Sequence, residues 1–535
     1  MKKILLWIGL LSLAFTMSSC DELDEGPYTV TFDDETLDSV VAEKDETIDL
    51  PFLETENGFL LGWEDPSGVI HDTTYIVKEN VTLTPVFESF NDVLELEFNE
   101  EEKVVSILNY NGHASRVKIP HTIDDYIVRF IGIEAFSETN PVRVDIPLTV
   151  YNIGMKSFSN MPNLKEVHYY GEYLGTVESV INKDVFDEII ESHEVCQSTN
   201  MDEDPTETNP WIFETGCPIT KVTEKTDPIN GPDGNVYFSY HVEQPASEAP
   251  IMSLNQRIGI TPFIGSEQLT TITLPDKYSF FESEIFEGIP NLETVYIENN
   301  PFIYSDNGVI YDKETESLLY YPSGLLTEDF VIPNHINHIS TWAFFGSKTQ
   351  TITIHDSLSF DEGAFAYLTG LKDIMVEEEN PYYTVHDGIV YSKDESTLLA
   401  YPAGKDATTH TIIPSVTIID DLAFMNQQYL ENIIISEGVQ TISDNAFIYL
   451  KSLVTADIAS TVDFIFAGNF FQREGTLETF IIRNETNVIH APAINIKMTE
   501  ALEIYIPDEL MIDYEEDMWW QQYADYFVPL SELDE

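Results

Sequence analysis

The feature that most constrains the fold is a repeat with a period of about 23 residues. Phenylalanines recur at equivalent positions over most of the chain, at Phe136, Phe158, Phe263, Phe286, Phe344, Phe365, Phe424, Phe447 and Phe470, and adjacent repeats are 21–23 residues apart. A fixed period of this length is typical of solenoids, in which each repeat forms one coil that stacks on the next. We therefore predict a repeat array rather than a set of unrelated domains.

One repeat shows how such a coil is built. The unit around Phe447 reads Leu430-Glu-Asn-Ile-Ile-Ile435, followed by Val439-Gln-Thr-Ile442 and the pair Ala446-Phe447. Apolar residues alternate in the first segment, which predicts a short strand, and a proline or polar turn ends the equivalent strands elsewhere. We expect the Ala-Phe pair to close the coil and its ring to stack on equivalent rings. Because one coil cannot bury its own apolar face, stability must come from stacking.

A longer duplication lies inside the array. The segments Asn300-Pro301, Asn307-Gly-Val-Ile-Tyr311 and Tyr321-Pro-Ser-Gly324 recur 80 residues later, ending at Tyr401-Pro-Ala-Gly404. Two apolar, tyrosine-bearing runs flank a polar turn in each copy, which predicts a β-hairpin inserted between coils. We expect both hairpins to project from one edge of the array.

The N-terminus has the pattern of an export signal. Lys2 and Lys3 precede an apolar run over residues 4–15, so residues 1–19 read as a signal peptide. Ser18 and Ser19 lead directly to Cys20, an arrangement that looks like a lipoprotein cleavage box with lipid attached to Cys20. The acidic residues 20–27 resemble the tether of surface-exported lipoproteins of Bacteroidetes. An ordinary signal peptide with a free thiol at Cys20 is the alternative.

Residues 28–88 read as a small separate β module. Tyr28, Val30 and Phe32 alternate, and the run 57–63 places two glycines beside Phe59 and Trp63. The segment resembles the Listeria-Bacteroides repeat, a β-grasp-like module of surface proteins, although its first hairpin is acidic rather than rich in glycine. The resemblance implies a spacer.

The repeat units themselves, with an Ile-Pro strand end and an Ala-Phe closure, resemble the BspA-type leucine-rich repeat family. The resemblance divides the chain into a first repeat block at 93–170, a second at 236–500 with the two hairpins, and a C-terminal cap at 501–535 that contains Tyr514, Trp519, Trp520 and Tyr523. It implies a mainly β fold with short helical and 3-10 segments. It also implies adhesion to, or binding of, host or environmental macromolecules rather than a defined reaction.

Residues 171–235 depart from the repeat pattern, which leaves continuity of the solenoid there open. This irregular insert contains Cys196 and Cys217. If Cys20 carries lipid, these two remain as a pair in an exported protein, and a disulfide between them would substitute for a missing core.

Charge and motifs limit the possible chemistry. The chain has 94 acidic and 25 basic residues, a formal net charge of −69, which argues against nucleic acid as a partner. Metalloprotease, serine-hydrolase, P-loop and dinucleotide-binding motifs are missing. We interpret His335 and His338 as a solvated pair and the acidic residues 202–207 as a solvated loop. We therefore expect no cofactor, no metal and no enzymatic activity.

The strands offer the candidate binding residues. In each predicted strand one outward residue lies between two inward apolar ones, and in order these are Thr273, Tyr296, Thr353, Met375, Ile434, Asp457, Ile481 and Tyr505. Tyr296, Met375, Ile434, Ile481 and Tyr505 would form an exposed apolar stripe suited to a protein or glycan. Alternatively, these side chains pack against lateral neighbours or lie beneath the hairpins.

The sequence thus predicts a lipid-anchored protein at the surface of the outer membrane that binds a host or environmental protein. Two other classes stay open. One is a glycan-capture component of a polysaccharide-utilisation system. The other is a cryptic hydrolase, which would require two carboxylates facing each other across a pocket at roughly 5–10 Å.

Overall fold

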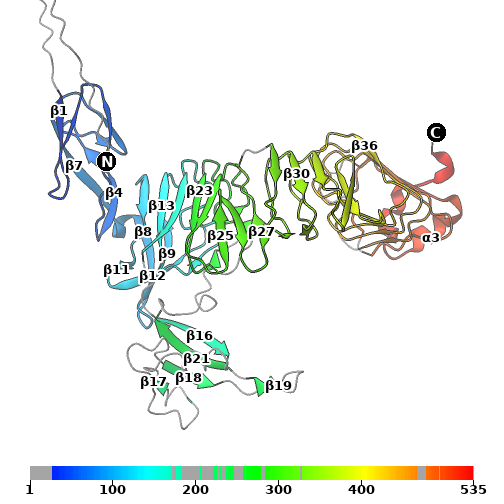
Figure 1. Cartoon of the computed structure of the whole chain (residues 1–535), viewed down its shortest axis with the longest axis horizontal. Helices are drawn as coiled ribbons and strands as arrows, with labels where there is room; N and C mark the ends of the chain where they lie inside the picture. Colours follow the sequence, from blue (N-terminus) through cyan, green and yellow to red (C-terminus); the bar gives the residue numbers. More distant parts are fainter. Residues whose placement is uncertain are drawn as a thin grey trace, which may run out of the picture. The chain divides into compact units, whose positions relative to one another are not determined.

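The computed structural model describes residues 27–171, several strands between 176 and 258, and residues 261–533 apart from 279–282, 326–327, 467–476 and 493. Cys20, Cys196, Cys217, Phe470 and most of the acidic segment 202–207 lie outside the described residues. The fold is mainly β with short helical segments, as predicted (Figure 1). It divides into two compact units, of which the first comprises residues 1–53 and 60–87 and the second residues 54–59 and 88–535.

The first unit is a small β structure built around Trp63. Its main sheet has the order β2-β1-β7-β4-β5, and β3 pairs with β6. Trp63 and Val30 are fully buried, the Phe32 and Trp63 rings meet at 4.9 Å, and the Trp63 Nε1–H donates to the Pro51 carbonyl at 2.8 Å. The strands are β1 (Tyr28–Phe32), β2 (Val40–Ala42), β3 (Thr47–Asp49), β4 (Gly58–Glu64), β5 (Ile70–His71), β6 (Thr74–Ile76) and β7 (Val81–Ser89). The likeness to the Listeria-Bacteroides repeat stays a prediction.

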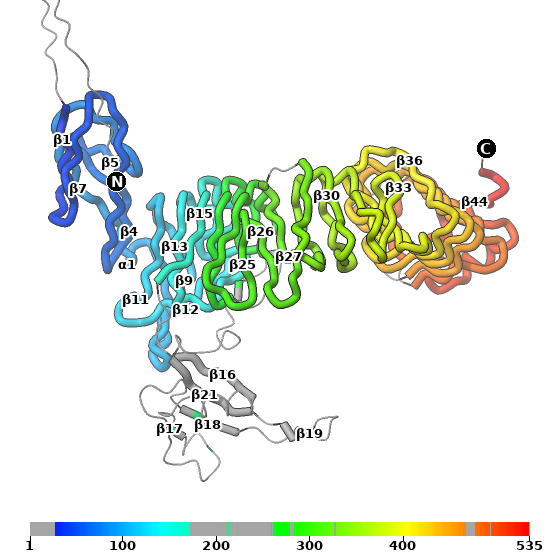
Figure 2. Tube along the Cα trace, viewed as in Figure 1, coloured from blue at the N-terminus to red at the C-terminus, as the bar shows by residue number. Residues whose placement is uncertain are grey.

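The second unit is a solenoid of stacked coils. Figure 2 follows the trace coil after coil from β9 to β44. Each regular coil contributes one strand of three to five residues to one side, and these strands form three parallel, in-register ladders. The N-terminal ladder consists of β10 (Arg116–Lys118), β13 (Arg143–Pro147), β15 (Glu166–Tyr170), β23 (Thr271–Leu274) and β24 (Thr294–Ile297).

The other two ladders follow along the chain. The middle ladder consists of β28 (Asp329–Val331), β30 (Thr351–Ile354) and β32 (Asp373–Val376). The C-terminal ladder consists of β36 (Thr409–Thr411), β38 (Asn432–Ile435), β40 (Thr455–Ile458), β42 (Thr479–Ile482), β43 (Glu503–Ile506) and β44 (Phe527–Pro529).

A second set of strands forms the opposite wall of the coils. The first of its sheets begins after helix α1 (Phe90–Val93) and contains β8 (Leu94–Asn99), β9 (Val104–Tyr110), β11 (Thr122–Ile123), β12 (Tyr126–Ile131), β14 (Asn152–Ile153) and β22 (Arg257–Ile258). The later sheets contain β29 (His338–Ile339), β31 (Ser359–Phe360), β37 (Ile418–Ile419), β39 (Thr441–Ile442) and β41 (Phe464–Ile465).

The recurring phenylalanines form the interior column that the repeat predicts. All eight that the structure describes are buried. Phe136 stacks on Phe158 at 5.2 Å, and Phe158 stacks on Phe263 at 5.7 Å. Farther along, Phe424 stacks on Phe447 at 4.9 Å. Each ring is therefore covered by the coil above and the coil below, which exclude water from it.

The duplicated segments are part of the wall rather than projections from it. Each forms three antiparallel strands, namely β25 (Ile303–Asp306), β26 (Val309–Asp312) and β27 (Ser317–Tyr320), then β33 (Tyr383–His386), β34 (Ile389–Ser392) and β35 (Thr397–Ala400). The expectation of projecting hairpins is wrong because the third strand of each pairs in parallel with the next coil. Ile310, Tyr311 and Tyr320 are consequently buried in the core.

Each duplicated segment also closes one edge of a ladder. The Gly308 carbonyl accepts a hydrogen bond from the Val295 amide of β24, and the Gly388 carbonyl accepts one from the Ile374 amide of β32. Gly308 has φ +84°, and a Cβ there would lie 2.7 Å from the Glu293 carbonyl oxygen. The turn approaches the strand this closely because glycine has no side chain.

The solenoid continues across the irregular insert. β15 pairs directly with β23, and the Lys165 carbonyl accepts hydrogen bonds from the Thr270 and Thr271 amides. Between them the chain forms a separate sheet of β16 (Thr176–Asn182), β21 (Ser239–Pro245), β18 (Lys221–Lys225) and β17 (Trp211–Ile212), and a pair of β19 (Ile229–Asn230) and β20 (Val236–Tyr237). The sequence predicted that the second repeat block begins at residue 236. In the structure β21 still belongs to the insert, because it pairs with β16, and pairing between coils resumes at β22.

The aromatic residues of the C-terminal segment pack into the same core as the last coils. The segment contains α3 (Met511–Glu516) and three 3-10 segments, η2 (Asp508–Leu510), η3 (Gln521–Tyr526) and η4 (Leu530–Glu532). Tyr514, Trp520 and Tyr523 are buried. The Trp520 Nε1–H donates to the Ile489 carbonyl at 2.8 Å, and the Tyr523 hydroxyl accepts from the Ile496 amide at 2.8 Å.

Candidate ligand-binding face

The candidate face is the outward side of the three ladders. The third residue of each regular strand lies in register with its equivalents, so that Thr273 pairs with Tyr296, Thr353 with Met375, and Ile434 with Asp457. The two residues on either side of each outward position point into the core. The alternation inferred from the sequence therefore places the candidate residues in continuous rows across each ladder.

Three of the five candidate residues are well exposed. The exposed fractions are 50% for Tyr296, 50% for Met375 and 39% for Ile434. Tyr505 is partly exposed and donates a hydrogen bond from its hydroxyl to Glu503 at 2.7 Å. These four side chains belong to all three ladders, so the outward face carries separate apolar positions rather than one unbroken stripe.

The prediction that Ile481 is exposed is wrong, because only 6% of it is accessible. Its register partners are Asp457 on one side and Tyr505 on the other. Arg483, which directly follows the end of this strand, forms a bidentate ion pair with Asp457 at 2.6 and 2.8 Å. Ile481 thus lies between long side chains of neighbouring strands, which is the lateral packing considered as the alternative.

The face has one further apolar residue that the sequence reading missed. Val331, the third residue of β28, is 65% exposed and pairs in register with Thr353. Its strand follows the first duplicated segment, where the repeat pattern is interrupted. The pattern Phe330-Val331-Ile332-Pro333 nevertheless has the Ile-Pro strand end of the other repeats and was the signal for it.

The N-terminal end of the face is charged. Asp145 is buried and accepts hydrogen bonds from the side chains of Arg116 and Arg143, both at less than 3 Å. Arg143 also reaches Glu166 at 3.1 Å. A buried carboxylate paired with two guanidinium groups is fully neutralised, so this cluster holds three strands together rather than presenting free charge.

An open hollow lies at the C-terminal cap. It has a volume of about 420 Å³ and is lined by Glu485, Pro507, Asp508, Glu509, Leu530 and Ser531. Hydrogen bonds from the Ser531 hydroxyl and amide lower the pKa of Asp508. A general acid for glycoside hydrolysis needs a raised pKa, so Asp508 does not have the property that the hydrolase hypothesis requires.

The described residues contain no group of three or more His, Cys, Asp or Glu side chains placed to hold a metal ion. His338 instead contacts Asp361 at 3.1 Å, and His335 contacts the Tyr304 hydroxyl at 3.0 Å. Within the same part of the chain, no helix is long and apolar enough to cross a membrane.

Sequence comparison identifies the repeats. The model of the BspA type leucine rich repeat region matches residues 110–224, 238–318, 323–388 and 403–513, in six copies, which is well over half of the chain. The chain belongs to the BspA-type leucine-rich repeat family. No curated protein sequence matches it. The resemblance inferred from the Ile-Pro and Ala-Phe signals is therefore confirmed for the repeats of this BspA-type chain.

Solved structures of leucine-rich repeat proteins are similar to this chain at low identity. A leucine rich cell surface protein from Faecalibacterium prausnitzii is 18% identical, with a TM-score of 0.36, covering 78% of this chain and 88% of its own. A leucine-rich repeat protein from Eubacterium ventriosum is 15% identical, with a TM-score of 0.28 and coverages of 78% and 73%. The pneumococcal vaccine antigen PcpA is 14% identical, with a TM-score of 0.31 and coverages of 82% and 98%.

Proposed function

We propose that this BspA-type chain is a lipid-anchored surface protein that binds a protein partner through the outward face of its ladders. The observation that carries the proposal is that Tyr296, Val331, Met375 and Ile434, at equivalent positions of four strands, are 39–65% exposed. Large apolar side chains at regular intervals on a rigid sheet are unfavourable in water unless a partner covers them. Aromatic residues and methionine are also enriched at protein interfaces.

Other outward positions of the ladders are polar and can form the rim of an interface. Threonines stand at other outward positions, including Thr271, Thr273, Thr351 and Thr353. Their hydroxyls can donate and accept hydrogen bonds. Because the ladders are already ordered by the stacked core, binding would cost little backbone entropy.

A matched pair of variants tests the face. Ile434 on the ladder and Ile418 on the opposite wall are the same residue type with nearly equal exposure, 39% and 38%. A partner is first selected by screening the chain against arrays of matrix and host proteins and of glycans. We expect Ile434→Ser to weaken binding and Ile418→Ser to leave it unchanged. Adding Tyr296→Ala and Met375→Ala to Ile434→Ser gives the ladder variant, which is expected to weaken binding at least tenfold.

Two results would contradict the proposal. Equal losses from the ladder variant and Ile418→Ser would show that the ladder face is not the binding surface. The second result is binding of the chain to glycan arrays but not to protein arrays, with loss of that binding in the ladder variant. It would identify the partner as a polysaccharide and the chain as a component of a glycan-capture system.

Surface anchoring rests on the N-terminal pattern and has its own test. We propose that lipid is attached to Cys20 after cleavage behind residue 19. In cell fractions, the protein is expected with the outer membrane and accessible to protease on intact cells, and Cys20→Ala is expected to release it. Mass spectrometry that finds an unmodified thiol at the mature N-terminus would exclude the anchor.

A further inference from the structure

The loops that close most of the coils contain two residues with left-handed backbone conformation. These residues lie two positions before and two positions after the column phenylalanine. In the N-terminal coils some of them are asparagine or glycine, such as Asn160, Gly265 and Gly288, whose φ values are 52°, 78° and 74°, and others, such as Glu134 and Lys156, have long charged side chains and φ values of 56° and 57°. Glycine and asparagine adopt this conformation at low cost.

Four bulky residues occupy the same positions in the later coils. Trp342, Tyr367, Leu422 and Tyr449 have φ values of 57–61°. Each is a backbone outlier for a large side chain and costs of order 1 kcal/mol or more. The coil itself does not need them, because Asn426 and Asn445 fill equivalent positions in two of these coils.

The four side chains gather in one place, which we call the turn ridge. They pack around the buried side chains of Ala366, Met425 and Ile448, separately from the interior column, and all four stay partly exposed. Tyr367 lies 6.2 Å from both the Trp342 and the Tyr449 ring. The ridge therefore runs across coils far apart in sequence.

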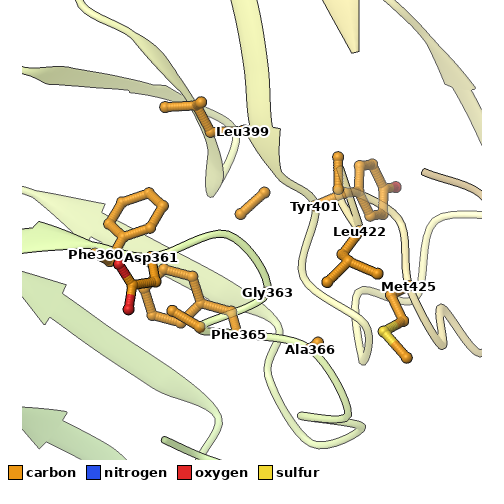
Figure 3. Close-up of a pocket in the computed structure, with 12 residues that line it drawn as sticks. Phe360, Asp361, Gly363, Phe365, Ala366, Leu399, Tyr401, Leu422 and Met425 are labelled. Atoms are coloured by element: carbon orange, nitrogen blue, oxygen red, sulfur yellow. The ribbon is translucent and has the colours of Figure 1, made fainter. Parts of the chain in front are cut away.

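Gly363 shows that the ridge is closely fitted. It has φ +71°, and a Cβ there would lie 2.6 Å from Leu422 Cδ1 and 3.3 Å from Trp342 Nε1. Figure 3 shows Leu422, Met425 and Ala366 on the neighbouring loops beside a small cavity of about 10 Å³, with Phe365 and Tyr401 also in its lining. That space holds one water molecule at most, so a ligand would bind on the ridge rather than beneath it.

Carboxylates accompany the ridge. Glu362, Asp421 and Asp444 stand at equivalent positions of three coils, each three residues before its phenylalanine. Asp421 faces both Glu362 and Asp444 closely enough that burial and their negative charges raise its pKa. Among the described residues, none of the ion pairs involves these three carboxylates, and no metal-binding cluster forms there.

We propose that the turn ridge is a second interaction surface, which binds an arginine- or lysine-bearing segment of another protein. Aromatic faces attract guanidinium and ammonium groups by cation–π interaction, and a cation would relieve the repulsion within the carboxylate row. The three carboxylates come from three different coils, so the row matches positive charges distributed along a chain better than a single ion. The backbone strain at the four ridge positions is then the cost of presenting these side chains.

The test uses the full chain and a synthetic octapeptide of alternating arginine and glycine, with a citrulline-glycine peptide as its uncharged counterpart. We expect measurable affinity for the arginine peptide and at least tenfold weaker binding of the citrulline peptide. The double variant Tyr367→Asn, Tyr449→Asn should weaken arginine-peptide binding about fivefold or more. The control variant Tyr126→Asn, Tyr382→Asn, at two tyrosines outside the ridge, should not.

Stability separates this proposal from a structural role. Asparagine suits the left-handed conformation, so we expect the ridge variant to unfold at the same or a higher temperature than the natural chain. A lower unfolding temperature with unchanged peptide affinity would show that the ridge merely fastens coils together, and would overturn the proposal.

A second variant keeps the rings and removes charge. Glu362→Gln with Asp421→Asn should weaken arginine-peptide binding more than Glu97→Gln with Glu101→Gln, which removes the same charge from an exposed site elsewhere. Equal effects would mean that the peptide responds only to net charge. Binding of soluble dextran that is lost in the tyrosine ridge variant, with no binding of the arginine peptide, would identify a sugar site instead.

Discussion

At the scale of single residues, the chain derives its stability from rings that can be buried only in a stack. Phe447 is fully buried against Phe424 at 4.9 Å. Its replacement leaves a cavity between coils that cannot close, because the ladders on both sides fix the coil spacing. We predict that Phe447→Ala lowers the free energy of unfolding by about 3–5 kcal/mol in chemical denaturation. A loss below about 1 kcal/mol would contradict the role of the column.

Asp420 gives a prediction on pH at the same scale. Burial, and then the negative charges of Glu362 and Asp421, raise its pKa to about 6. The folded state therefore prefers the protonated carboxyl of Asp420. The stabilisation that this protonated group gives the fold is complete below about pH 4 and is lost as the pH rises from about 4 to 6. We expect Asp420→Asn to stabilise the chain by about 1–2 kcal/mol at pH 7.5, and by much less at pH 4, in thermal unfolding followed at both values. An equal gain at both pH values would contradict this assignment.

At the scale of elements, the duplicated segments depend on glycines in their turns. Gly308 lies where a Cβ would meet the backbone of Glu293 and Thr294, whereas a Cβ at Gly68, with the same φ of +84°, would meet only a carboxylate oxygen of Glu64 at 3.8 Å. We predict that Gly308→Ala costs about 2–4 kcal/mol, while Gly68→Ala costs only about 1 kcal/mol for its backbone conformation. Equal costs in denaturation experiments would show that the turn does not press against β24.

The elements also show what the sequence could and could not predict. The column and the outward rows follow from local periodicity, which is why Phe136 to Phe447 and the exposure of Tyr296, Met375 and Ile434 were predicted. The burial of Ile481 depends on Arg483 and Asp457, which meet only through strand register, and no local pattern encodes that contact. The third strand of each duplicated segment was missed for the same reason, since its parallel partner lies in the next coil.

The turn ridge was missed although a signal existed. Glycine or asparagine recurs two residues after the phenylalanine at Asn160, Gly265, Gly288, Gly346 and Asn426. This recurrence marks a left-handed position, so Tyr367 and Tyr449 could have been recognised as exceptions to it.

At the scale of the whole molecule, the insert between β15 and β23 is separable from the coil stack. Thr176 of β16 and Pro245 of β21 are register partners, so the insert's sheet begins and ends at adjacent positions. We predict that a chain lacking residues 176–245 keeps its β circular dichroism per residue and unfolds within about 3 °C of the natural chain, because the Phe158–Phe263 contact is retained. A collapse of the thermal transition would show that the coils depend on the insert.

The closed edges of the ladders bear on how tightly a partner can be held. Because the turns at Gly308 and Gly388 end the first two ladders, the outward face is divided into three rigid patches on one scaffold. A partner that repeats its own epitope could occupy two patches at once, and the second contact would then form at the high effective concentration set by the first. Weak individual sites would thereby give slow dissociation from fibrous or multimeric targets, and only fleeting contact with single copies.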